Sequence, residues 1–551
     1  MKKYLLLITM GVCLQSAAQD PVLVNYVFQT PPPLNTLLLQ TPNSMILVTP
    51  EGNNNLSQLW TRFDDSFNVV SKKRLVLPEN TKVVRQNYYE SNAGIIRLDQ
   101  SIKQNRIEVD LFLFNDDGNI SASQNLVSHE DYKENIDGRR PYPFLPVFSA
   151  DKSKIALIKL DQMSEDSLSV SATVASTSAG KKFHTNYRIA FDGDLQDPPA
   201  FVLNNNGVLA AIVPDKFKSY TLGSTIHCYF SEEGKDKPVK GKLLFPRKKI
   251  KTPYIRMDNS GLFISALFSE GNEKESVAGW INGSFDYKTS NWKEAKSYTF
   301  SKDMNKKLKR VYGHAVPAKD ILNYLHVMTD EYETEPVLFA TLVPFESNRK
   351  YQPFYGSNAR VPYINTTEQQ QRLDAINRLI SAPLPFNIPG IPQPITSFAD
   401  AYTFTNIFRS EPGGYATNNF NYASNTSQPG RSAVWQRSSL LYFATDSSSK
   451  ITKYQFEKIY PTSDAGYYFN SRFKNKDGSY SALYYYTPGL RKPYLNKLTI
   501  DKKGNVSEKK LFENSNMTLD YSYPHIIRNN KLISFYYYVR TNDVGIIAID
   551  L

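Results

Sequence analysis

Short turn sequences recur through this chain at a nearly constant interval, and this repetition constrains the fold more than any other feature. Each turn of a first series separates two apolar runs and centres on Asn43, Asn92, Asp151, Asn205, Asp258, Asp320, Asp477 and Asn530. A second series follows about 25 residues behind the first, at Asp65, Asp117, Gly180, Gly234, Lys288, Ser448 and Gly504. Both series have gaps near 54 residues, and both are broken by one gap of about 160 residues at the same place. Two matched periods with a shared break indicate a repeat architecture that carries one large insertion.

Each repeat unit therefore contains two hairpins, because Asn, Asp, Gly and Ser supply the positive φ values that tight turns need between apolar runs. Two hairpins make a four-stranded antiparallel sheet, and radial stacking of such sheets gives a β-propeller. We expect an all-β fold of eight four-stranded blades, with seven as the alternative. The last unit has room for three strands, and residues 22–28 (VLVNYVF) offer a fourth. We therefore expect strands from the two ends of the chain to close the ring.

The first residues are typical of an export signal. Lys2 and Lys3 precede the apolar run YLLLITMGVCL, and Ser16, Ala17 and Ala18 form a small-residue cleavage site. We expect a signal peptide over residues 1–18 and the propeller over residues 20–551. Lipid attachment at Cys13 is the less favoured alternative, because Val12 is large for the residue before a lipidated cysteine. Cys228, in the apolar sequence TIHCYF, is then expected to be a buried structural thiol.

The chain is basic, with 65 Lys and Arg against 53 Asp and Glu. Many of the cations follow a turn of the second series, which would place them on the outer edge strand of a blade, where lysines oppose pairing with other chains. A second group lies in the long connections between units: Arg139, Arg140, the run from Arg247 through Lys248 and Lys249 to Lys251, and the run from Lys306 to Arg310. If both tight turns of each unit lie on one face of the ring, these connections emerge together on the opposite face.

The insertion covers residues 346–438 and has an unusual composition. A short helix is predicted near residues 366–381, with Asn365 as its N-cap. Five prolines in the following segment favour extended chain. Aromatic side chains then recur among polar residues, and the candidates for apolar anchors are Phe386, Phe404, Phe408 and Tyr415. Two interpretations remain open: a lid folded over the propeller and an element that docks a partner.

One turn of the first series carries a family resemblance. The sequence Phe148-Ser149-Ala150-Asp151-Lys152-Ser153-Lys154-Ile155-Ala156 resembles the Phe-Ser-Pro-Asp-Gly-x-x-Ile-Ala element of TolB-type propellers with Pro-Asp repeats. The resemblance implies a periplasmic or secreted binding propeller. The leader and the blades rich in Asn and Tyr also resemble exported proteins of the Bacteroidota.

Local signatures of hydrolases, zinc enzymes, nucleotide-binding proteins and calcium sites are absent from the sequence. We therefore expect a binding or scaffold protein of the bacterial cell envelope, periplasmic or associated with the outer membrane. It would recognise a protein partner through the basic connections and the insertion. We expect no cofactor, metal, nucleic acid or further membrane span. The alternative is a glycan-active hydrolase or lyase at the mouth of the ring, with candidate residues Glu130, Asp131, Asp137, Asp194, His314 and Asp520.

Overall fold

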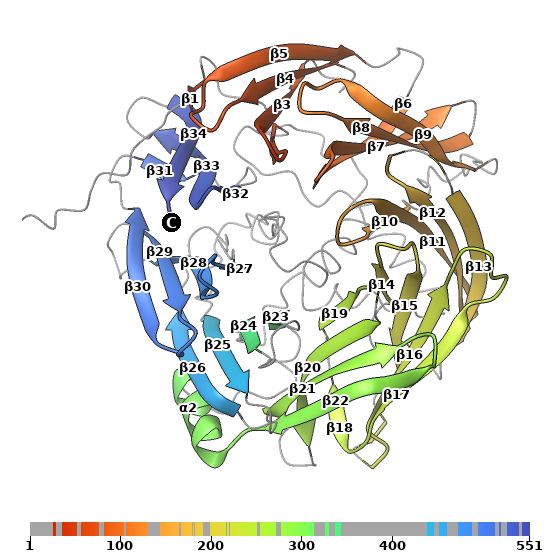
Figure 1. Cartoon of the computed structure of the whole chain (residues 1–551), viewed down its shortest axis with the longest axis vertical. Helices are drawn as coiled ribbons and strands as arrows, with labels where there is room; N and C mark the ends of the chain where they lie inside the picture. The colour runs from red at the N-terminus through yellow and green to blue at the C-terminus, as the bar shows by residue number, and fades with distance from the viewer. Residues whose placement is uncertain are drawn as a thin grey trace, which may run out of the picture.

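A computed structural model of the chain shows β-sheets arranged around a ring (Figure 1). The structure describes residues 26–28, 36–51, 57–76, 82–103, 106–129, 144–164, 167–178, 180, 182–190, 199–215, 218–219, 221–250, 254–259, 261–270, 277–312, 325–329, 337–342, 438–445, 451–459, 472–486, 494–512, 517–519, 526–538 and 543–551. Statements below about side chains and contacts refer to these residues.

Seven sheets are blades whose strands follow one another along the chain. Blade 1 contains β2 (Leu37–Gln40), β3 (Met45–Glu51), β4 (Ser57–Phe63) and β5 (Val69–Val76). Blade 2 contains β6 (Lys82–Ser91), β7 (Gly94–Lys103), β8 (Arg106–Phe114) and β9 (Ile120–His129). Blade 3 contains β10 (Leu145–Phe148), β11 (Lys154–Ser164), β12 (Ser167–Ser176) and β13 (Lys182–Ala190). Blade 4 contains β14 (Ala200–Leu203), β15 (Leu209–Pro214), β16 (Ser224–Ser231) and β17 (Val239–Phe245).

The remaining blades follow the same order. Blade 5 contains β18 (Lys248–Ile250), β19 (Tyr254–Met257), β20 (Leu262–Glu270), β21 (Val277–Asp286) and β22 (Asn291–Thr299), and is followed by the helix α2 (Lys302–Tyr312). Blade 6 contains β23 (Leu325–Thr329), β24 (Val337–Leu342), β25 (Ser438–Thr445) and β26 (Ile451–Ile459). Blade 7 contains β27 (Arg472–Lys474), β28 (Tyr480–Tyr486), β29 (Tyr494–Ile500) and β30 (Val506–Phe512). The closing sheet combines β1 (Tyr26–Val27) with β31 (Met517–Leu519), β32 (Ile526–Arg528), β33 (Lys531–Tyr538) and β34 (Asp543–Asp550).

The expectation of eight four-stranded blades is wrong. Seven blades each contain a path of four hydrogen-bonded strands built from one stretch of chain, which matches the seven-blade alternative. The closing sheet is a composite of both chain ends and has five strands, because β31 and β32 both pair with β33. Blade 5 also has a fifth strand, because β18 and β19 pair with different parts of β20. The turn series could not distinguish the closing sheet from the blades, since this sheet also contains a hairpin, between β32 and β33.

The apolar core lies between neighbouring sheets, and β15 shows why. Its alternate residues Leu209, Ala211 and Val213 pack into a cluster shared with blade 3. The intervening residues Ala210 and Ile212 pack into a second cluster, shared with blade 5. Since successive side chains of a strand point to opposite faces, a strand that is apolar at every position needs a neighbouring sheet on each side. A ring supplies both neighbours to every blade.

A five-residue turn recurs at the hairpins and explains the Asn and Asp of the two turn series. In the turns that begin at Asp64, Asn115, Asn204 and Asp501, the side-chain oxygen accepts hydrogen bonds from the backbone N–H groups two and four residues later, at 2.7–3.1 Å. The fourth residue has a positive φ, and its N–H donates to the carbonyl of the first. Gly118, Gly207 and Gly504 fill this fourth position in three of the turns. In blade 1 it is Phe67, whose φ is 63° and whose buried ring packs against the closing sheet.

Lys152 occupies the same left-handed position, with a φ of 57°, and stands where the TolB-type element has glycine. A residue with a Cβ atom is strained there. We predict that Lys152→Gly raises the free energy of unfolding by about 0.5–1 kcal/mol relative to Lys152→Ala, which removes the same side chain but keeps the Cβ atom. Urea denaturation of the two variants measures the difference. Equal stability, or a more stable alanine variant, would show that the backbone here is not strained.

The ring closes where the N-terminal strand β1 pairs antiparallel with β34, as the sequence predicted, with Tyr26 opposite Ile546 and Val27 opposite Gly545. Tyr26 contacts Phe63 of blade 1 edge to face, and the ring of Phe28 stacks on Phe535 of β33. Both side chains add to an apolar cluster that joins the closing sheet to blade 1. The two ends of the chain thus complete one sheet and one inter-blade core.

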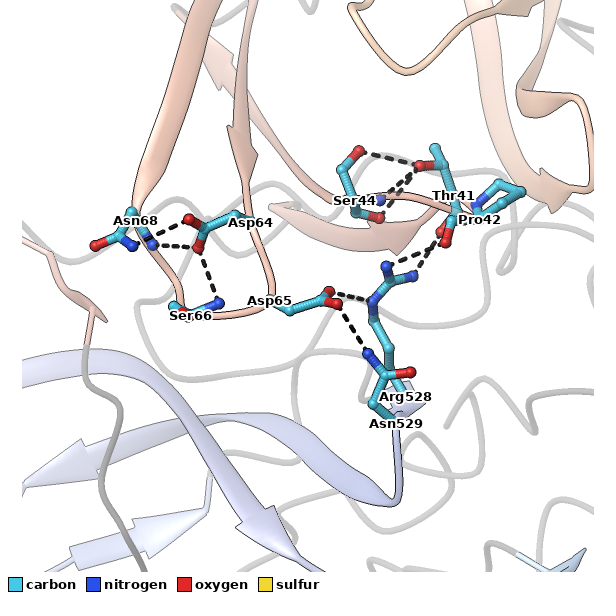
Figure 2. A network of polar contacts seen from close by, with 9 residues as sticks. All are labelled: Thr41, Pro42, Ser44, Asp64, Asp65, Ser66, Asn68, Arg528 and Asn529. Atoms are coloured by element: carbon cyan, nitrogen blue, oxygen red, sulfur yellow. Dashed lines mark hydrogen bonds and ion pairs between the residues drawn. The ribbon is translucent and has the colours of Figure 1, made fainter. Parts of the chain in front are cut away.

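Arg528 adds a polar latch at this joint (Figure 2). Its guanidinium donates to Asp65 Oδ1 at 2.7 Å, to the carbonyl of Thr41 at 2.7 Å and to the carbonyl of Pro42 at 3.1 Å. Asn529 donates to the other oxygen of Asp65 at 2.9 Å. One arginine of the closing sheet therefore holds both hairpin turns of blade 1.

We predict that Arg528→Ala lowers the free energy of unfolding by about 1–2 kcal/mol, because it removes a charge-assisted pair and leaves two backbone carbonyls without their donor. Arg74→Ala is the matched control. Arg74 pairs with Glu51 at 2.6 Å within blade 1, but its side chain is 66% exposed, so its removal should change stability little. Urea denaturation of both variants tests the latch, and losses of equal size would contradict it.

The structure differs from the sequence analysis around blade 6. The first hairpin of this blade joins β23 to β24 and its turn follows Thr329, whereas the first-series turn at Asp320 lies outside the described residues. Within the predicted connection between blades 5 and 6, the sequence KDMNKKLKRVY forms the helix α2, whose Met304 is buried against the propeller. The signal peptide, Cys13, the predicted helix at residues 366–381 and almost all of the insertion lie outside the described residues.

Candidate binding surface

The two faces of the ring differ in what they carry. Hairpin turns of neighbouring blades contact one another on one face, which we call the turn face. There Asn43 donates to Asp116 at 2.6 Å, Arg62 pairs with Asp117 at 2.5 Å, and Asn204 donates to the carbonyl of Asp258 at 3.3 Å. Since antiparallel strands alternate in direction, the connections within and between blades emerge on the other face, which we call the connection face. The turn face is thus occupied by contacts that hold blades together.

The insertion is rooted on the connection face. It leaves blade 6 after β24 and returns at β25, and these two strands are antiparallel neighbours. Leu342, the last residue of β24, lies opposite Ser439, so the two ends of the intervening segment are adjacent. Residues 343–437 therefore replace a mid-blade connection without interrupting the sheet.

The predicted basic run at Arg247 forms a tight turn between β17 and β18 on the same face. Arg247 is exposed and has a φ of 60°. Lys248 pairs with Glu270 at 3.2 Å, and its ammonium lies 5.0 Å from the centre of the Phe268 ring. Lys248 and Lys249 are half-buried. Lys248 therefore ties β18 to β20, and among the described cations of this run Arg247 is the exposed one.

The helix α2 lies on the outside of the ring beside β26 (Figure 1). Tyr454 of β26 donates a hydrogen bond to Asp303, and Lys307 pairs with Asp303 at 3.4 Å while its ammonium lies 4.8 Å from the centre of the Tyr454 ring. Lys302 and Lys306 are exposed. Arg310 belongs to the last turn of this helix. The helix thus presents cations to solvent while one aromatic side chain anchors it to blade 6.

The hydrogen bond from Tyr454 holds the pKa of the Asp303 carboxyl below its ordinary value. We predict that Tyr454→Phe raises this pKa towards the ordinary value, and that Lys307→Ala raises it less, because the tyrosine hydroxyl is the stronger cause. Since the pKa is lowered in the folded protein, the contact stabilises the docked helix above the ordinary carboxyl pKa and is lost as pH falls through the lowered value. NMR titration of the Asp303 carboxyl measures both shifts, and a larger effect of Lys307→Ala would contradict the assignment.

The other predicted site residues lie outside the described residues. They are Arg139, Arg140, Phe386, Phe404, Phe408 and Tyr415 for partner binding, and Glu130, Asp131, Asp137, Asp194, His314 and Asp520 for the glycan alternative. Of the predicted surface, the described residues therefore include the Arg247 turn, the backbone of α2 and the two strands between which the insertion lies. Cys228 is fully buried, and burial raises the pKa of its thiol, as expected of a structural cysteine.

Sequence reasoning missed two features of the described residues. Leu222 and Leu244 are exposed beside the Arg247 turn, and the alternation of β17 could have placed Leu244 on its outer side. Arg97 and Asp99 form a buried pair at 3.0 Å, with the guanidinium over the rings of Phe112 and Phe114. This pair lies inside blade 2, so it contributes to packing and not to a solvent-facing site.

Within the described part of the chain, no group of three or more His, Cys, Asp or Glu side chains is arranged to hold a metal ion. No helix among the same residues has the length and apolar character needed to cross a membrane.

Comparison with known proteins identifies no family. No protein-family model and no curated protein sequence matches the chain. Among solved structures, the WD40 domain of SCAP from fission yeast is similar over 96% of this chain and 98% of that chain, at 8% identity and a TM-score of 0.35. The Dos1 propeller matches over 55% of this chain and 64% of its own length, at 11% identity and a TM-score of 0.28. A mutant of the Synechocystis apocarotenoid oxygenase matches over 57% and 67%, at 8% identity and a TM-score of 0.27. Scores this low carry no argument about function, and the propeller assignment rests on the strand topology of the chain itself.

Proposed function

We propose that this chain is an exported β-propeller that acts as a binding or scaffold protein in the bacterial cell envelope and recognises a protein partner through its connection face. One observation carries the proposal: the large insertion, the exposed Arg247 turn and the basic helix α2 are all rooted on that face. A rigid scaffold that carries its elaborated segments on one side is typical of binding proteins. The TolB-type element around Asp151 and the N-terminal leader support the envelope assignment.

The aromatic and the basic segments would contribute to binding in different ways. Buried aromatic anchors supply affinity, each contributing roughly 1–3 kcal/mol, and Phe386, Phe404, Phe408 and Tyr415 are the candidates in the insertion. Exposed cations such as Arg247, Lys302 and Lys306 mainly raise the association rate with an acidic partner and make it sensitive to salt. We therefore expect the insertion to determine which partner binds and the basic segments to determine how fast it binds.

Affinity capture from envelope extracts tests this proposal. The intact protein is compared with a variant in which residues 351–431 are replaced by a short Gly/Ser linker. Since the ends of the insertion are adjacent in the sheet, the linker should leave blade 6 intact, which a thermal melt can verify. We predict that the linker variant loses one or more specific partners. Identical partner lists from two equally stable proteins would refute the docking role and leave the lid as the explanation of the insertion.

The role of the cations is tested on the partner recovered in this way. We predict that Arg247→Glu lowers its association rate at low salt and that 0.5 M salt removes the difference. Lys72→Glu is the matched control, because Lys72 is also an exposed cation but lies on the outer strand of blade 1. Equal effects of the two substitutions would show that only the net charge of the protein matters.

A further inference from the structure

Two exposed leucines, Leu222 and Leu244, belong to adjoining segments at the rim of blade 4 where β17 ends on the connection face. The exposed fraction is 64% for Leu222 and 53% for Leu244, and no other large apolar side chains of blades 3 to 7 are as exposed among the described residues. The others above this level lie on the outer strands β5 and β9, in blades 1 and 2. Leaving two leucines in water is unfavourable in the isolated protein, so their joint exposure on this rim points to a ligand.

The backbone brings the two leucines to neighbouring positions. Leu222 lies in a tight turn that Gly223 closes by donating its N–H to the carbonyl of Ser219 at 2.9 Å. Gly223 has a φ of 76°, and a Cβ atom built on it would lie 2.1 Å from the carbonyl oxygen of Phe245 and 2.9 Å from the nitrogen of Arg247. Leu244, which precedes Phe245, lies opposite Thr225. The turn that carries Leu222 therefore abuts the end of β17, which carries Leu244, and the turn of Arg247.

Cations surround this pair. Lys242 precedes Leu244 by two residues on the same exposed side of β17, and Arg247 is exposed in the adjoining turn. Glu270, the carboxylate beside this turn, is already paired with Lys248 at 3.2 Å. The rim thus presents exposed aliphatic side chains beside exposed cations.

We propose that this rim of blade 4, formed by Leu222, Leu244, Lys242 and Arg247, docks the protein on the surface of an anionic phospholipid bilayer. The leucines would enter the boundary between headgroups and acyl chains, and the cations would contact the lipid phosphates. A bilayer fits both features, because it offers an apolar layer directly beneath a layer of negative charge. A soluble polyanion would use the cations and leave the leucines in water. This inference goes beyond the proposed function, because it needs neither a partner protein nor the insertion.

Co-sedimentation of the full chain with lipid vesicles tests the proposal without any partner protein. We predict binding to vesicles that contain phosphatidylglycerol and at least tenfold weaker binding to vesicles of phosphatidylcholine alone. Leu222→Ser combined with Leu244→Ser should weaken binding to the anionic vesicles about tenfold or more, and Arg247→Gln should weaken it about fivefold. Val69→Ser combined with Val70→Ser is the matched control, because these residues are 41% and 52% exposed on β5 of blade 1. This control should bind like the wild type.

A second measurement reports insertion directly. Leu222→Trp should show a blue shift of tryptophan emission with anionic vesicles, measured against the wild-type protein under the same conditions. An equal loss of binding in the leucine and valine variants, equal binding to the two kinds of vesicle, or an unshifted emission of the bound tryptophan variant would each overturn the proposal. So would the absence of vesicle binding from a protein that still captures its partner, a result that leaves the proposed function intact.

Discussion

Blades such as blade 4 have two apolar faces, and the need to bury both is the constraint on which the rest of the structure depends. Strands such as β15 send alternate residues into the cores on either side, so a blade at the end of an open stack would expose half of its apolar surface. A closed ring removes that cost, but it requires the first and last parts of the chain to meet. The chain meets this requirement twice at one joint, through the pairing of β1 with β34 and through the latch of Arg528. Closure at this joint therefore gives the first and the last sheet of the ring a neighbour on each side.

The same geometry explains why the two faces differ. On the turn face, hairpins must be short and their backbone polar groups must be satisfied. In several described turns an Asp or Asn side chain accepts hydrogen bonds from the turn backbone, and Asn204 also donates to the neighbouring blade. On the connection face, a segment of any length can leave one strand and return to the next without disturbing the sheet. The segments that contain α2, the basic turn and the insertion all leave their strands on that face. The alternating direction of the strands therefore explains why the turn face holds the blades together and the connection face can carry long segments.

The parts of the fold that depend on local chemistry could be predicted from the sequence. Turn residues such as Asp65, Asn205 and Gly504 revealed the hairpins, and the unpaired strand before the first blade revealed how the ring closes. Features that depend on tertiary contacts could not be predicted in this way. The helix α2 is a basic segment stabilised by the packing of Met304 and by Tyr454, which lies about 150 residues away. In blade 5, β18 and β19 pair with different parts of β20, and in the closing sheet β31 and β32 pair with different parts of β33. The turn series does not indicate these additional strands. The exposed pair of Leu222 and Leu244 appears only when two turns are brought together.

Removal of the N-terminal strand tests the central claim of ring closure most directly. A chain lacking residues 1–29 loses β1 and the partly buried rings of Tyr26 and Phe28. The account predicts that its free energy of unfolding falls by about 3–5 kcal/mol and that backbone amides of β34 near Gly545 and Ile546 lose protection from hydrogen exchange. A truncated protein whose stability stays within about 0.5 kcal/mol of the full chain, with β34 equally protected, would contradict closure of the ring by the two chain ends.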